Sequence, residues 1–165
     1  MNNEHIIFDD IYHNIMWKEM IKRLQHLSWP MSKIKFTINP IIIIKKEIVH
    51  DKGLKELYNN CAACQYAKEI IGHNMKNWLC QYCPFEYIFK KENEAIFLCD
   101  RYPDGPYTIL LNIAASMLFA DTKTEFNQLK RRAIKIARTI KNMPLRQGVI
   151  RKSQLIQKEN QNEDE

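Results

Sequence analysis

The sequence predicts a mainly α-helical fold with room for one short strand or hairpin. Apolar residues recur at the three-to-four-residue spacing of a helix in several segments. Only 4 glycines and 6 prolines occur in 165 residues, and most lie between the apolar segments, so few tight hairpins are expected. The 45 % hydrophobic content supplies apolar surface for a buried core.

The first helix is expected to begin at Asp9 or Asp10, because a carboxylate accepts the free amide protons of a first turn. Apolar residues with helical spacing follow, and the breaker segment 28–30 is expected to end the helix. The apolar stripe consists of Trp17, Met20, Ile21, Leu24 and Leu27, and it leaves Lys18, Lys22 and Arg23 on other faces.

The segment 34–44 predicts a strand and then an ambiguous apolar run. Apolar and polar residues alternate over 34–38, which is the period of a half-buried strand. The isoleucines at 41–44 fit a buried strand, and they also fit a helix, because Asn39 can cap it and Pro40 suits its first position. Periodicity leaves both open, and in either case we expect burial, since an exposed strand of this composition would aggregate.

Two further helices are predicted in the second half of the chain. Segment 109–119 is apolar on nearly all sides, as in a buried helix, and is shorter than the roughly 20 residues of a membrane span. Thr122 and Glu125 match a capping box that begins a long amphipathic helix, which ends near Pro144. We therefore predict one domain over 1–144 and a polar, basic-then-acidic flexible tail over 145–165.

Two Cys-x-x-Cys pairs with fifteen residues between them predict a metal site. Cys61 with Cys64, and Cys80 with Cys83, can place four thiolates around one tetrahedral Zn²⁺, with an iron–sulfur cluster or redox thiols as alternatives. A closed four-ligand site stabilises a fold and has no position for an activated water. We expect a helical domain organised around this knuckle. Cys99 is expected to be a small buried hydrophobe, or else an alternative ligand.

The region from 123 to 158 is strongly basic and contains one acid, Glu125. On the long helix, the cations expected to contact nucleic acid are Lys130, Arg131, Lys135 and Arg138. Such a row also fits an ordinary solvated face, and no recognition-helix signature or aromatic interleaving accompanies it. The other cations of the region are Lys123, Arg132, Lys141, Arg146, Arg151, Lys152 and Lys158.

Catalytic motifs are not visible in this sequence. It contains no phosphate-cradling glycine loop, no His-Glu-x-x-His and no Gly-x-Ser-x-Gly. Its scattered aspartates lack the paired spacing of general acid–base sites, so we expect no enzymatic activity. The amino terminus shows no secretory pattern, which predicts a cytoplasmic location and no membrane association.

The two cysteine pairs and their flanks resemble a group of small proteins encoded by phages and prophages of Gram-positive bacteria. The matching residues are Trp17, segment 26–30, Cys61 to Ala67, Cys80 to Pro84, Cys99 and Ala137 to Pro144. The chain departs from the pattern in its isoleucine run, in the loop after Cys99 and beyond Pro144. The resemblance implies a zinc-binding phage accessory protein in the cytoplasm of an infected bacterium.

Two functions follow as hypotheses. The first is a zinc-stabilised, non-enzymatic accessory protein whose basic helix contacts nucleic acid. The alternative is a protein–protein module that binds and inhibits a host enzyme or an anti-phage defence component. A thiol- or cluster-dependent enzyme is a much weaker third interpretation.

Overall fold

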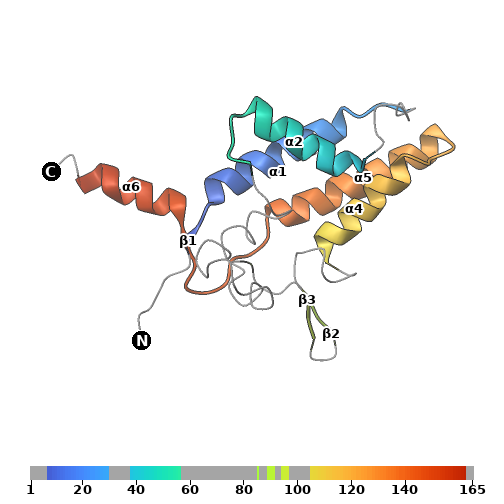
Figure 1. Cartoon of the computed structure of the whole chain (residues 1–165). Helices are drawn as coiled ribbons and strands as arrows, with labels where there is room; N and C mark the ends of the chain where they lie inside the picture. The colour runs from blue at the N-terminus through green and yellow to red at the C-terminus, as the bar shows by residue number, and fades with distance from the viewer. Residues whose placement is uncertain are drawn as a thin grey trace, which may run out of the picture.

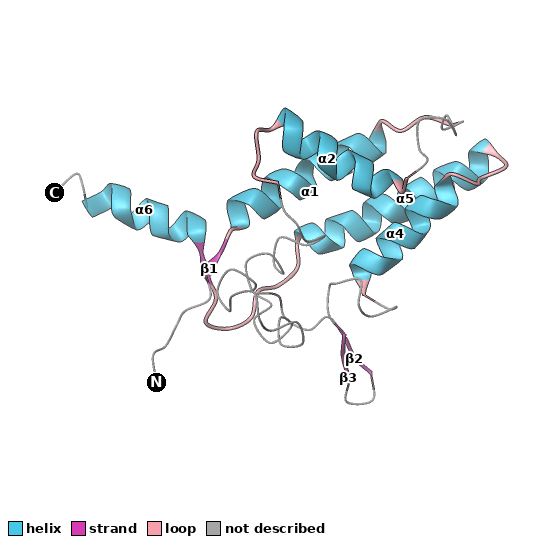
Figure 2. Ribbon diagram, in the orientation of Figure 1, coloured by secondary structure: helices cyan, strands magenta, loops and turns pink. Residues whose placement is uncertain are grey.

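The structure, a computed structural model, describes residues 7–29, 38–56, 85, 89–91, 94–96 and 105–162. These residues are mainly helical, as predicted (Figure 2). The helices are α1 (Asp10–Gln25), α2 (Pro40–Asp51), α4 (Pro106–Met117), α5 (Lys123–Lys141) and α6 (Lys152–Asn162). The strands are β1 (Ile7–Phe8), β2 (Phe89–Lys91), β3 (Glu94–Ile96) and β4 (Ile150–Arg151), with β1 parallel to β4 and β2 antiparallel to β3.

Four helices form a bundle in which α1 packs on α5, α5 on α4, α4 on α2, and α2 on α1 (Figure 1). The core lies between them and is almost entirely apolar. Fully burying one of these aliphatic or aromatic side chains stabilises the fold by about 1.5–3 kcal/mol. Its largest fully buried side chains include Tyr107, Phe8, Phe126, Met20, Leu24, Ile41, Ile48 and Leu110.

Helix α1 begins as the sequence predicts. Asp9 is its N-cap, and one carboxylate oxygen accepts a 3.0 Å hydrogen bond from the backbone amide of Tyr12. The apolar stripe turns inward, with Trp17, Met20 and Leu24 buried. The helix ends at Gln25, shortly before the predicted breaker segment.

The isoleucine run is helical, which decides between the two interpretations that its sequence allows. Asn39 accepts a 3.0 Å hydrogen bond from the amide of Ile41 and donates one of 2.8 Å to the carbonyl of Leu111 on α4. Pro40 occupies the first turn, where its missing amide proton costs nothing. Ile41 and Ile44 are buried as expected. Most of the strand predicted over 34–38 lies outside the described residues.

The C-terminal segment, predicted to be a flexible tail, contains regular structure. Strand β4 pairs with β1, and helix α6 follows it and extends away from the bundle (Figure 1). The buried carboxylate of Asp10 accepts hydrogen bonds from the backbone amide, at 3.0 Å, and from the hydroxyl of Ser153. Lys152 pairs with Asp9 at 3.1 Å. These contacts join the start of α6 to the start of α1.

Candidate nucleic-acid interface

Helix α5 begins with the predicted cap. Thr122 is the N-cap, and its hydroxyl accepts a 3.1 Å hydrogen bond from the backbone amide of Glu125. The Glu125 carboxylate accepts a 3.0 Å hydrogen bond from the amide of Asp121, one residue before the position of a standard capping box. Both acidic side chains lie at the positive end of the helix dipole. The remainder of α5 carries no acidic residue.

Three of the four predicted nucleic-acid contacts share one exposed face of α5. Arg131, Lys135 and Arg138 are four and three residues apart, so they form a row about 10 Å long at 1.5 Å per residue. All three are exposed, and none forms an ion pair or side-chain hydrogen bond with a residue that the structure describes. Arg132 is also exposed and lies beside this row.

Lys130, the fourth predicted contact, has a structural position. Its side chain is half-buried, and its ammonium donates hydrogen bonds to the carbonyls of Gln25 at 3.3 Å and Leu27 at 3.0 Å. The same ammonium lies 5.8 Å from the centre of the Phe126 ring. The carbonyls at the end of α1 carry the negative end of the helix dipole, so this lysine stabilises that end.

His13 makes the reciprocal contact at the other end of the helix pair. Its Nε2 lies 3.2 Å from the carbonyl oxygens of both Ile140 and Lys141, at the end of α5. Two carbonyl partners require Nε2 to carry a proton. Because α1 and α5 each supply a donor to the other's last turn, the two helices run antiparallel with fixed register.

Burial lowers the pKa of His13 to about 4, with smaller contributions from the charges of Lys141 and Arg151, although the backbone hydrogen bonds oppose the change. The ring is 5.3 Å from that of Phe8 and 5.2 Å from that of Phe85, centre to centre. His13 is therefore neutral at pH 7 and is part of the core.

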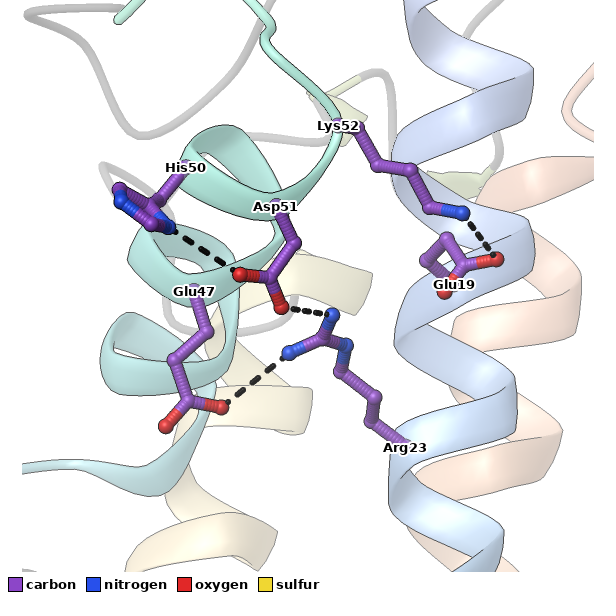
Figure 3. A network of polar contacts seen from close by, with 6 residues as sticks. All are labelled: Glu19, Arg23, Glu47, His50, Asp51 and Lys52. Atoms are coloured by element: carbon purple, nitrogen blue, oxygen red, sulfur yellow. Dashed lines mark hydrogen bonds and ion pairs between the residues drawn. The ribbon is translucent and has the colours of Figure 1, made fainter.

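Three acidic side chains, Glu19, Glu47 and Asp51, lie between α1 and the end of α2 (Figure 3). Arg23 bridges Asp51 at 2.7 Å and Glu47 at 3.3 Å. The hydrogen bond from Arg23 lowers the pKa of the Asp51 carboxyl, and the same bond raises the pKa of Arg23. A second pair, Lys52 with Glu19, lies next to it at 3.3 Å. Acids and cations neutralise each other on this side of the molecule.

The predicted zinc ligands lie outside the described residues, as does the fifth cysteine: Cys61, Cys64, Cys80, Cys83 and Cys99. Zinc binding therefore stays a prediction. Phe85, two residues after the last paired cysteine, is buried against Phe8 with ring centres 5.1 Å apart. Its backbone also bridges to Leu145. Across the described ranges, no group of three or more histidine, cysteine or acidic side chains is arranged to hold a metal ion.

Sequence reasoning assigned no role to His13 or Ser153, and it named Asp10 only as an alternative cap of the first helix. It placed Lys18 and Lys22 only off the apolar stripe. For the two lysines, their four-residue spacing was the available signal.

Comparisons with protein-family models, with curated proteins and with solved structures find no match to this chain. Among the helices that the structure describes, none has both the length and the apolar character needed to cross a lipid bilayer.

Proposed function

We propose that this protein is a non-enzymatic, zinc-binding phage accessory protein that acts in the cytoplasm of an infected bacterium and contacts nucleic acid through α5. The observation that carries the proposal is the row of Arg131, Lys135 and Arg138, which is exposed and has no anionic partner among the described residues. Like charges four residues apart destabilise a helix by about 0.2–0.5 kcal/mol. A phosphate backbone would relieve this repulsion and release condensed counterions.

Fluorescence anisotropy with labelled nucleic acid tests the proposal. The variant Arg131→Glu/Lys135→Glu/Arg138→Glu removes the row and spares Lys130, whose loss would disturb the end of α1. A matched control, Lys46→Glu/Lys123→Glu/Lys158→Glu, changes the net charge equally at exposed positions outside the row. We expect the first variant to lose salt-sensitive binding and the control to keep most of it. Equal affinity of the two variants would reject the proposal.

One observation favours the alternative, a module that inhibits a host enzyme or defence component. Phe119, in the turn between α4 and α5, is 75 % exposed, and Trp29 is 36 % exposed with its indole nitrogen 3.4 Å from the Ala120 carbonyl. Exposed aromatic rings of this kind are frequent anchors in protein interfaces. A nuclease-treated pull-down from host lysate would support this function if wild type retains one stoichiometric protein that Phe119→Ser loses.

A further inference from the structure

A second pair of lysines extends the basic row of α5 across to α1. Lys18 and Lys22 are exposed, lie one turn apart on α1, and form no ion pair with any residue in the described part of the chain. Glu19 and Arg23, one residue further in each case, bind side chains of α2 and of its C-cap residue, Lys52. An α-helix turns by about 100° per residue, so the two lysines do not share the α2-facing side of α1.

The contacts between α1 and α5 place the lysines relative to the arginines. On α5, Lys130 reaches α1, and Arg131 comes one residue later. On α1, His13 contacts the end of α5, and Trp17 and Ile21 follow it at four-residue intervals on the same packed side. Lys18 and Lys22 come one residue after Trp17 and Ile21. In two antiparallel helices, a residue that comes one position after an interface-facing residue lies on the same face of the pair, whichever helix it belongs to. Lys18 and Lys22 therefore lie on the solvent face that carries the α5 row.

The register of the two helices sets the level of each cation along the pair. His13 lies level with the end of α5 at Ile140, and Gln25 lies level with Lys130. Interpolation between these contacts places Lys18 near the level of Lys135 and Lys22 between Arg131 and Lys135. Packed helix axes are about 8–10 Å apart, so the two rows lie side by side on this face.

The other residues that the structure describes on this face are neutral or basic. Exposed Asn14, Gln25 and Gln128 carry no charge, whereas Glu19, Glu47 and Asp51 are paired on the α2 side. The aromatic rings Trp17 and Phe126 are buried and offer no surface for stacking bases. Two rows of cations, without an exposed ring between them among the described residues, suit phosphates and not unstacked bases.

We infer that α1 and α5 together form one double-row basic surface that binds the backbone of double-stranded nucleic acid without reading its sequence. This inference rests on the proposed function and deepens it by naming the ligand class and the second helix. Its cations are Lys18, Lys22, Arg131, Lys135 and Arg138. If each contacts one phosphate, the logarithm of affinity falls with the logarithm of salt concentration with a slope of about −4.5, compared with about −2.7 for the α5 row alone.

Anisotropy titrations of a labelled 20-base-pair duplex test the inference. For wild type, affinity is expected to fall roughly 500-fold between 50 and 200 mM salt, whereas for Lys18→Gln/Lys22→Gln the fall is expected to be roughly 40-fold. The control Lys46→Gln/Lys158→Gln changes charge equally and should keep the wild-type salt dependence. Thermal unfolding of each variant checks that its fold is retained.

The outcomes separate this inference from the proposed function. A wild-type salt slope in Lys18→Gln/Lys22→Gln, together with lost binding in the α5 triple variant, overturns the two-helix surface and leaves the α5 proposal intact. Undiminished binding by the triple variant overturns both. Tighter binding to a single strand of the same sequence than to the duplex overturns the assignment of the ligand class, as does a strong preference for one duplex sequence.

Discussion

Substituting Lys130 by methionine should show that this cation stabilises the fold, whereas the neighbouring cations of α5 bind nucleic acid. Methionine keeps most of the aliphatic stem and removes the ammonium that donates to Gln25 and Leu27 at 3.3 and 3.0 Å. A hydrogen bond from a charged group contributes about 1.5–3 kcal/mol when shielded, and a cation at a helix C-terminus contributes about 0.3–1 kcal/mol. Because Lys130 is only half-buried, we expect a net loss of about 1–2 kcal/mol.

Thermal and urea unfolding measure this loss directly. For a domain of this size the melting temperature should fall by roughly 3–6 °C in Lys130→Met. The matched variant Lys135→Met, on an exposed side chain, should stay within about 0.5 kcal/mol of wild type. Below the melting transition, duplex affinity should drop in Lys135→Met and change little in Lys130→Met. Unchanged stability of Lys130→Met, with a loss of affinity equal to that of Lys135→Met, would refute the structural role.

Three further predictions concern other parts of the molecule. The unfolded chain protonates His13 near pH 6.5, whereas the folded chain does so only near pH 4, so about 3 kcal/mol of folding stability that is present above pH 6.5 is lost as the pH falls. Urea titrations of His13→Gln, which keeps an N–H donor, should show a flatter decline of stability with falling pH than wild type. Identical pH profiles of the two proteins would contradict this. Asp10→Asn should weaken the attachment of α6 to α1 by about 1 kcal/mol. Hydrogen exchange should then be faster at the Ser153 amide and unchanged in α5. Equally faster exchange in α5 and α6 would count against this role of Asp10. Purified protein should contain one zinc ion per chain, and a chelator should lower its melting temperature; metal-free protein that melts cooperatively at one temperature with or without chelator would exclude the zinc site.

Local signals in the sequence predict the helices well where the stabilising partner is nearby. Asp9, Thr122 and the pair Asn39-Pro40 each act within one turn of their own helix, so a short stretch of sequence contains the whole interaction. The isoleucine run shows the limit of this approach. Its composition suits a strand or a helix. The Asn39 cap and the hydrogen bond from Asn39 to the Leu111 carbonyl on α4 together stabilise the helix.

Long-range contacts explain what the sequence does not reveal. The residues from 145 onward are polar, which is typical of a tail, yet Asp10 and Ser153 meet across most of the chain length and anchor α6. The helical pattern of α5 also groups Lys130 with its basic neighbours. Periodicity shows which residues share a face of a helix, but it does not show which other element packs against that face. Only the packing of α1 shows that Lys130 and His13 stabilise helix ends.

Lysine acetylation followed by mass spectrometry, with and without saturating duplex, tests the central claim most directly. Lys135 is exposed on the α5 row, and Lys46 and Lys158 are also exposed, on α2 and α6. We predict that the duplex strongly slows acetylation of Lys135 and leaves Lys46 and Lys158 unchanged. Equal reactivity of Lys135 in the two conditions, at a duplex concentration that saturates binding, would contradict the basic face of α5 as the site of nucleic-acid contact.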